Sequence, residues 1–193
     1  MDINAAIEDM CLHYSSLGEE CRQELKALCT LAVHEKGTLL VKEGQLSGKN
    51  YYIVKGCVRA CYLKDGKDIT DWFAFEHEFI NAINSYYQHV PSPHYIEVLE
   101  QSIILEMSRD TVNTLAERYH DFALQGTLIL GRIMLQLQQR IVSLQFESAQ
   151  QKYTHLVHVR PDITQRVALT HIASYLGITL ETLSRIRNPK RRI

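Results

Sequence analysis

The spacing of apolar residues changes once along the chain, at about Ser108, and this change most constrains the fold. From Gly37 to Ser108, β-branched and aromatic runs recur between turn signals, which predicts short strands. Ser108 can cap a helix that begins at Arg109 or Asp110, and the apolar period is then helical as far as Phe146. We therefore expect an α+β chain in which an all-β roll or sandwich is followed by one unusually long helix.

Six strands are expected before Ser108, separated by residues that favour turns. They run from Thr38 to Lys42, Tyr51 to Val54, Val58 to Leu63, Ile69 to Phe75, Tyr95 to Leu99 and Ile103 to Met107. Asp65-Gly66 suits a tight hairpin turn, and Gly44 and Gly56 are natural sites for a positive φ.

One set of apolar positions in the long helical segment alternates steps of four and three residues, as in a seam between two supercoiled helices. The set is Ala123, Thr127, Leu130, Met134, Leu137, Ile141 and Leu144. It predicts a parallel homodimer whose interface contains Leu130, Met134, Leu137, Ile141 and Leu144. The alternative is an amphipathic helix packed on its own β domain, and the apolar residues off the seam indicate that some such packing also occurs. These residues are Leu128, Ile129, Ile133 and Val142.

The stretch from Thr170 to Asn188, T-H-I-A-S-Y-L-G-I-T-L-E-T-L-S-R-I-R-N, predicts two helices joined by a tight turn. Gly177 supplies the turn, and Thr179 can cap the second helix. The apolar inner faces consist of Ile172, Ala173 and Leu176 in the first helix and Leu183 and Ile186 in the second. A short helix from Ser148 to about His158, ended by Pro161, is expected before this helix-turn-helix.

The second helix of this motif carries side chains that suit the major groove of DNA. Glu181 can accept a hydrogen bond from cytosine N4, and Arg185 can form a bidentate pair with guanine. Lys190, Arg191 and Arg192 would meet phosphates, which adds affinity without reading sequence. For any single charge, a solvated helix face is the alternative. The DNA-binding residues that we predict are Thr170, Thr179, Glu181, Thr182, Ser184, Arg185, Arg187, Lys190 and Arg191.

Charge is distributed unevenly along the 193 residues. The segment from Arg160 to Ile193 has seven Lys and Arg against two acids, a local charge of +5, so the remainder is −6 because the whole chain carries −1. A basic segment on an acidic body favours an anionic partner such as nucleic acid. No apolar run is long enough for a membrane span, and the first residues lack the layout of a signal peptide. We expect a cytoplasmic protein with no membrane partner.

The five cysteines are irregularly spaced, so we expect reduced thiols rather than a disulfide framework. Cys57 and Cys61 could form a metal or redox pair, but they alternate with apolar residues in an expected strand. Buried structural cysteines are the favoured interpretation.

The motifs together resemble the Crp/Fnr superfamily of bacterial regulators. K-E-G, Y-Y-I-V-K-G-C-V-R and D-G, between Gly37 and Gly66, are similar to the family's cyclic-nucleotide-binding β-roll, and E-T-L-S-R, Glu181 to Arg185, is similar to its recognition segment. The run I-A-S-Y-L-G-I-T-L-E-T-L-S-R-I-R particularly resembles the Bacteroides-type branch.

That resemblance implies three parts. They are a β-roll sensor of the jelly-roll type over residues 1–120, a dimerisation helix over 121–146, and a winged-helix-type helix-turn-helix over 147–193. It also implies double-stranded DNA, a second copy of the chain, RNA polymerase and a small-molecule effector as partners. The effector would bind between the β-roll and the long helix. Glu181 and Arg185 become the base-reading residues.

The chain departs from the family's phosphate-binding cassette, in which a Glu holds the ribose and an Arg neutralises the cyclic phosphate. Phe79-Ile-Asn-Ala and Ser92-Pro-His stand at the two positions, and both charged groups are missing. A buried phosphate without a cation is poorly compensated, so cyclic AMP is not the expected effector. The effector is unidentified, and Asn81, Ser92 and His94 are the residues we would place near it. Cys11, Cys21 and Cys29 lack the tight spacing of an iron–sulfur sensor, and no cofactor is expected.

Two other functions deserve comparison. A cupin-like metal enzyme could use the histidines and acids of the roll, namely His77, Glu78, His89, His94 and Glu97. No His-x-His pair occurs, however, and neighbouring strand residues point to opposite faces, so neither a metal site nor an enzyme is expected. The second alternative is a ligand-sensing or protein-interaction module of the same fold without sequence-specific DNA binding.

Overall fold

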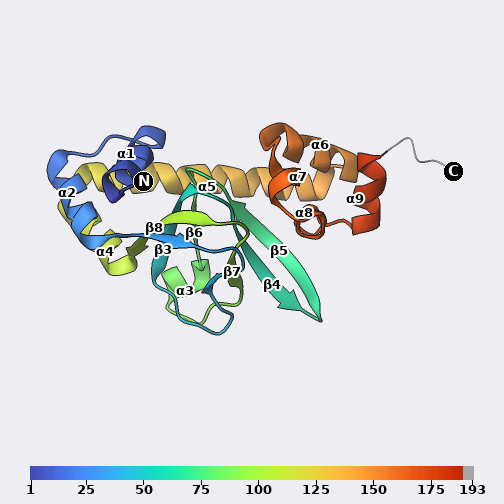
Figure 1. Cartoon of the computed structure of the whole chain (residues 1–193), viewed down its shortest axis with the longest axis horizontal. Coiled ribbons are helices and arrows are strands. Elements are labelled where there is room, and N and C mark those ends of the chain that lie inside the picture. Colours follow the sequence, from blue (N-terminus) through green and yellow to red (C-terminus); the bar gives the residue numbers. More distant parts are fainter. Residues whose placement is uncertain (189–193) are drawn as a thin grey trace.

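The computed structural model describes residues 1–188, and its axis is the long helix α5 (His120–Phe146) (Figure 1). Two helices precede the strands and lie at one end of α5: α1 (Ile3–His13) and α2 (Glu19–Leu28). Four helices follow α5 and gather at its other end: α6 (Ala149–Val159), α7 (Ile163–Arg166), α8 (Leu169–Leu176) and α9 (Leu180–Arg187). The expected α+β fold class is confirmed.

The strands form two antiparallel sheets of four strands each. One has the order β1 (Thr30–His34), β8 (Ser102–Ser108), β3 (Lys49–Lys55) and β6 (Phe79–Asn81). The other has the order β2 (Leu39–Val41), β7 (Tyr95–Val98), β4 (Val58–Lys64) and β5 (Lys67–Ala74). The short helix α3 (Ile83–Gln88) connects β6 to β7. All six expected strands are confirmed, whereas β1 and β6 were not predicted.

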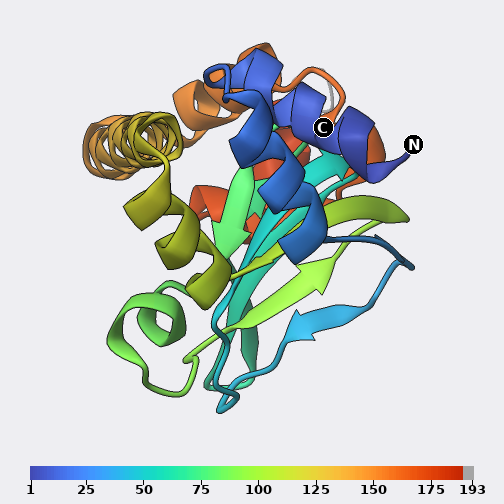
Figure 2. The same ribbon diagram turned by 90° about the vertical axis from the view of Figure 1, so that its left-hand side faces the viewer.

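Strand β3 is buried on both faces, which explains its unbroken apolar run. Tyr51 and Ile53 belong to the cluster between the two sheets. Tyr52 and Val54 point the other way, into a cluster that the N-terminal helices and α4 (Arg109–Arg118) complete. Figure 2 shows these helices covering one side of the roll, with α5 seen end-on. The roll is therefore packed between the N-terminal helices, α4 and α5 rather than standing alone.

The expected turns are confirmed at their backbone angles. Asp65 and Gly66 both have positive φ, 52° and 72°, the combination that a type I′ turn requires between β4 and β5. Gly44 and Gly56 also have positive φ, 79° and 109°. At Gly56 a Cβ atom would lie 2.1 Å from Ser102 Oγ and 2.8 Å from Ser102 Cα, so the turn between β3 and β4 approaches the start of β8 too closely for a side chain.

The single long helix predicted after Ser108 is wrong, because two helices occupy that segment. Ser108 does cap α4, accepting from the Thr111 amide at 3.0 Å. The helix then stops at Tyr119, whose φ of −120° and ψ of 111° are extended. The Tyr119 hydroxyl donates to Glu24 of α2 at 2.8 Å. This long-range contact stabilises the extended residue between α4 and α5, which the helical periodicity of the sequence does not reveal.

The C-terminal helices confirm most of the expected local signals. Ser148 and Gln151 form a capping box at the start of α6. Gly177 ends α8 with a left-handed φ of 68°, and Thr179 caps α9 by accepting from the Thr182 amide at 3.1 Å. Residues 147–188 contain no strand, so the wing of the expected winged-helix form is not found in the part of this region that the structure describes. The residues between α6 and α8 instead form the short helix α7.

Among residues 1–188, no helix is both long enough and apolar enough to cross a membrane.

We expect Gly56→Ala to lower the free energy of unfolding by about 3 kcal/mol, because it adds backbone strain and overlap with Ser102. Gly66→Ala is the matched control, since its φ is also positive but nothing lies within 4 Å of the added Cβ. It should cost about 1 kcal/mol. Urea unfolding of both variants checks this, and equal losses would show that the contact between residue 56 and Ser102 relaxes at no cost.

Candidate DNA-binding surface and effector cavity

Helix α9 presents its polar side chains to solvent. The side chains of Glu181 and Arg185 are 84% and 78% exposed, and they lie one helical turn apart with 3.7 Å between Arg185 Nη2 and Glu181 Oε2. Ser184 and Arg187 are also exposed, whereas Leu183 is fully buried beneath them. The apolar side of α9 thus packs inward, and its first two turns present one acidic and one basic side chain to a partner.

The remaining predicted DNA-binding residues are placed less uniformly. Thr170, in the first turn of α8, is exposed, and Thr179 is exposed at the cap of α9. Thr182 is half-buried, and its hydroxyl lies 3.0 Å from that of Thr179, so it takes part in the cap. Lys190 and Arg191 lie outside the described residues.

Helix α5 carries a stripe of exposed apolar side chains. Leu130, Met134, Leu137, Ile141 and Leu144, the positions of the predicted seam, are between 40% and 67% exposed. Of the apolar residues off the seam, Ile129 and Ile133 are half-buried, while Leu128 and Val142 are exposed. Large apolar side chains in one row rarely stay in water on a stable monomer.

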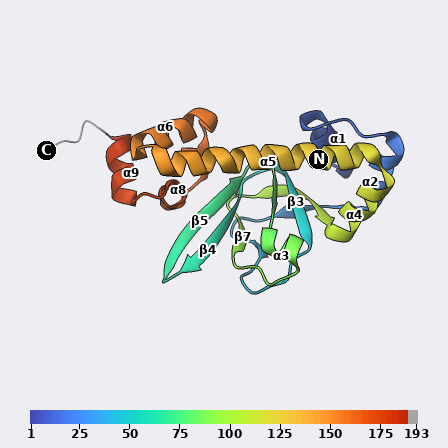
Figure 3. The same ribbon diagram turned by 180° about the vertical axis from the view of Figure 1, so that it is seen from behind.

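The helix-turn-helix is docked onto the roll through α8, which packs against β5 (Figure 3). Ile172, Ala173 and Leu176 of α8 share one apolar cluster with Phe73 and Phe75 of the roll. The inner face of the first helix therefore contacts both α9 and the roll.

A buried guanidinium lies beside this apolar contact. Arg59 of β4 is 4% exposed, and its two terminal nitrogens donate hydrogen bonds to the two carboxylate oxygens of Asp68, each at 2.6 Å. Its Nε donates to Glu97 at 2.8 Å, and its Nη1 lies 2.9 Å from Nδ1 of His171 in α8. Burial and the nearby Arg59 cation lower the pKa of His171, so its neutral ring accepts this hydrogen bond.

A second ion-pair group links the same parts. Arg166 of α7 donates to both Glu76 oxygens, at 2.9 and 2.6 Å, and also to Glu100 and Asp162. Burial favours the neutral acid at Glu76, but the hydrogen bonds from Arg166 and from the Gly56 amide, together with the charge of Arg166, outweigh it and hold the pKa of Glu76 below its usual value. These partly buried charges fix the C-terminal helices to the roll in one orientation.

A cavity of about 350 Å³ lies between the roll and α5. Its walls are mainly apolar, and the polar groups among its lining residues include Asn50, Asn81, His94 and Gln125. Asp71 is the one carboxylate among the described lining residues, which include neither lysine nor arginine. Such a cavity suits a ligand without negative charge.

The three residues expected near an effector are placed differently. Asn81 lines the cavity, and its amide donates to Asn50 at 3.4 Å. His94 lines it too, is 2% exposed, and has no hydrogen-bond partner for either ring nitrogen among the described residues. Burial lowers the pKa of His94, which keeps the ring neutral. Ser92 is buried but does not line the cavity, since its hydroxyl donates to the His94 carbonyl at 2.7 Å.

The cysteine pair in the roll is buried, as expected. Cys57 and Cys61 are 0% and 4% exposed, and burial raises the pKa of the Cys61 thiol to about 11. Thiols with raised pKa values are poor nucleophiles and poor metal ligands at neutral pH. This supports the structural interpretation of the two cysteines.

Residues 32–119 match the model of the cyclic nucleotide-binding domain family. This range begins in β1 and ends at Tyr119, the break before α5. It includes the roll from β2 onward and α4, and it leaves out the helices at both ends. No curated protein sequence matches the chain.

Solved structures extend the likeness to most of the chain. The regulator FixK2 from Bradyrhizobium japonicum is 17% identical, with a TM-score of 0.67 and 83% of each chain covered. The c-di-GMP-responsive global regulator CLP from Xanthomonas campestris is 15% identical, with a TM-score of 0.69 and 89% of this chain and 91% of that one covered.

The catabolite activator protein of Thermus thermophilus is 19% identical, with a TM-score of 0.55 and 90% of this chain and 84% of that one covered. At such identities the likeness concerns the fold. Residues 32–119 are therefore similar to the cyclic nucleotide-binding domain, and the chain shares the overall fold of the Crp/Fnr regulators.

Proposed function

We propose that the chain is a cytoplasmic transcriptional regulator of the Crp/Fnr type, a homodimer that binds a palindromic operator under the control of a small molecule other than cyclic AMP. In this proposal residues 1–120 sense the effector, 121–146 form the dimer, and 147–193 bind DNA. RNA polymerase would be its partner at the promoter. The run from Ile172 to Arg187 supports placing it in the Bacteroides-type branch.

The observation that carries the proposal is the exposed pair Glu181 and Arg185 on the first turns of a capped helix. A helix reads the major groove with its N-terminal side chains, and its apolar face must be held by a supporting helix. Leu183 and the cap at Thr179 meet the second need, since they orient α9 on α8. Surface ion pairs contribute little to stability, so the pair is free to exchange its partner for base edges.

Dimerisation is supported by the exposed apolar stripe on α5. A seam with steps of four and three residues keeps its side chains on one face over many turns, where a second copy of the same helix can cover them. A twofold axis along α5 would also place the two α9 helices symmetrically, which matches the symmetry of a palindrome.

The cavity supports a neutral effector. Cyclic nucleotide phosphate carries a full negative charge, and no cation among the described lining residues would compensate it. His94 offers one donor and one acceptor that are otherwise unused. A mainly apolar molecule with a hydrogen-bonding group would therefore suit these walls.

A ligand-sensing module of this fold without sequence-specific DNA binding is the competing function. Selection of DNA from a random pool by the purified protein separates the two. Enrichment of an inverted repeat with half-sites about one helical turn apart supports the regulator. Equal binding of selected and random DNA, in the presence and absence of candidate metabolites, would support the module.

Arg185→Ala should lose about 1–3 kcal/mol of discrimination at one base pair of the selected operator. Lys190→Ala is the control, because a phosphate contact weakens all DNA sequences similarly. Fluorescence anisotropy with operator and scrambled DNA measures both effects. If Arg185→Ala weakens both DNAs equally, the assigned base contact is wrong.

Met134→Glu should convert the dimer to a monomer, because it places two like charges in the centre of the seam. Leu128→Glu makes the same change at an apolar residue of similar exposure that lies off the seam, and it should leave the dimer intact. Light scattering after gel filtration measures the mass of each variant. Dissociation by both variants, or by neither, would contradict the proposed seam.

His94→Leu should raise the free energy of unfolding of the ligand-free protein by about 1 kcal/mol, because it removes a buried polar group without partners. His171→Leu should have the opposite sign, since the Nδ1 of His171 contacts Arg59. Urea unfolding compares the two. A loss of stability in both would mean that the His94 ring already has a partner in the ligand-free protein.

A further inference from the structure

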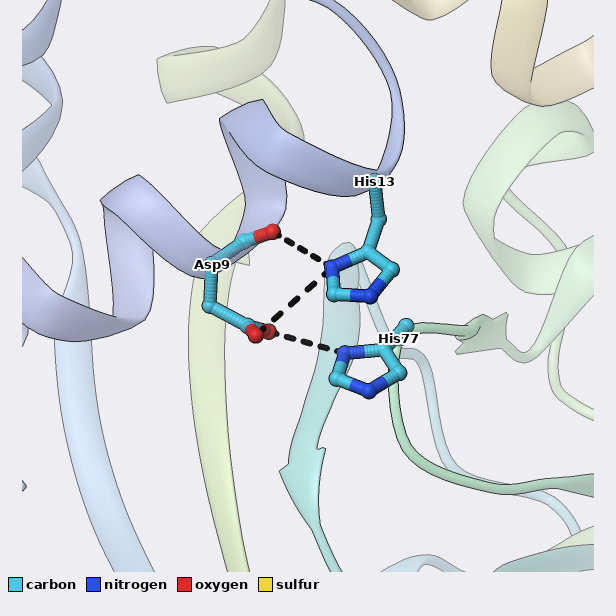
Figure 4. A group of neighbouring side chains, drawn as sticks. All are labelled: Asp9, His13 and His77. Carbon is cyan, nitrogen blue, oxygen red and sulfur yellow. Dashed lines mark hydrogen bonds and ion pairs between the residues drawn. The ribbon is translucent and has the colours of Figure 1, made fainter.

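Three groups that commonly bind metals meet where α1 approaches the loop between β5 and β6. Asp9 and His13 lie one turn apart on α1, and His77 comes from the loop (Figure 4). The two imidazole rings stack, with centroids 3.5 Å apart and an angle of 11° between their planes. Nothing in the sequence links His77 to Asp9 and His13, which lie far away in the chain, so this cluster was not predicted.

The distances suit one small cation. His77 Nδ1 lies 3.0 Å from Asp9 Oδ2, and His13 Nδ1 lies 3.6 Å from Asp9 Oδ1. One possible ligand atom from each of the three residues can be chosen so that all three atoms lie within 4.8 Å of one another. Ligand atoms of a tetrahedral zinc ion, with bonds of about 2.0–2.2 Å, are about 3.4 Å apart. The distances from His77 and His13 Nδ1 to Asp9, 3.0 and 3.6 Å, lie on either side of that value. His13 Nδ1 also donates to the Asp9 backbone carbonyl at 2.8 Å, and the two rings are stacked. Binding of an ion would therefore require the rings to rotate out of the stack and His13 to give up that hydrogen bond.

Surrounding hydrogen bonds hold the ligands in place, as outer-shell groups do at metal sites. The Tyr52 hydroxyl donates to Asp9 Oδ2 at 2.7 Å, and the Tyr14 hydroxyl donates to the His77 carbonyl at 2.8 Å. Burial and the bond to Asp9 raise the pKa of Tyr52, so it remains a neutral donor. Asp9 Oδ2 thus contacts both Tyr52 and His77, while Asp9 Oδ1 is the oxygen nearer to His13.

The backbone at His77 is a second, independent feature. Its φ of 67° is in the left-handed region, which residues other than glycine adopt at a cost in strain. This conformation turns the imidazole towards α1. The side chains of Asp9, His13 and His77 are 17%, 32% and 38% exposed, so water can reach the cluster and supply the remaining coordination positions.

We propose that Asp9, His13 and His77 form a binding site for a divalent transition-metal ion, and that zinc is the ion this set of two nitrogens and one carboxylate fits. The ion would tie α1 to the loop that also carries Glu76 and Glu78. Those two acids bind Arg166 and Arg160 of the C-terminal region. The site does not depend on the proposed regulator function, because only its ligands define it.

The test is a titration of the chelator-treated full chain with zinc chloride, followed by calorimetry and by the thermal unfolding midpoint. We expect one ion per chain and a midpoint that rises with zinc. Histidine ring signals in NMR spectra should shift at His13 and His77 first. His77→Asn should weaken zinc binding by at least tenfold, and asparagine is chosen because it tolerates a left-handed φ.

His89→Asn is the matched control, since His89 is an exposed histidine with a φ of 59° outside the cluster, and its zinc binding should equal that of the unchanged chain. Asp9→Asn is the second variant in case His77→Asn folds poorly, and circular dichroism checks both. Absence of saturable binding, or equal zinc affinity in His77→Asn and His89→Asn, would overturn the proposal. The cluster would then be a hydrogen-bonded His–Asp network only.

Discussion

The contact between β5 and α8 determines how the two ends of the molecule are related. The apolar side of α8 packs against Phe73 and Phe75, so the helix that supports α9 is itself part of the roll's core. Arg59 and Arg166 add a buried and a half-buried group of ion pairs at the same junction. Because packed cores exchange between discrete arrangements rather than deforming smoothly, α9 can be re-aimed only by repacking this junction as a whole.

Helix α5 connects the other elements. Leu130 and Leu137 line the cavity and also belong to the exposed stripe, so a molecule in the cavity and a second chain on the stripe would contact the same two side chains. A ligand changes such an equilibrium only by binding one arrangement more tightly than another. A shared side chain provides that difference directly, since its rotamer affects both contacts. Ligand binding in the cavity and association of a second chain on the stripe would therefore be coupled directly through these two side chains.

Most of the fold could be predicted from local signals, and the exceptions share one cause. Runs of β-branched and aromatic residues between turn signals predicted six of the eight described strands, and Ser108, Ser148, Gly177 and Thr179 marked helix ends correctly. The break at Tyr119 and the strands β1 and β6 depend on partners far away in the chain, such as Glu24.

The candidate sites likewise divide into those marked by a local motif and those formed by distant segments. Asn81 and His94 were found by their positions in a motif, whereas the cluster of Asp9, His13 and His77 exists only because α1 packs beside a loop more than sixty residues away.

Charged side chains are distributed differently over the cavity, the junction of the roll with the C-terminal helices, and helix α9. In the cavity, the described lining residues are almost uncharged, while Arg59 and Arg166 are held among carboxylates at the junction with α7 and α8. Charges in partly buried pairs are screened weakly by salt, whereas charges on largely exposed side chains such as Arg185 are screened strongly. Ionic strength should therefore affect contacts made by α9 far more than the docking of α8 on the roll. If the protein binds DNA as proposed, a steep salt dependence of its DNA affinity would report on charges meeting phosphates and would not indicate that the junction has opened.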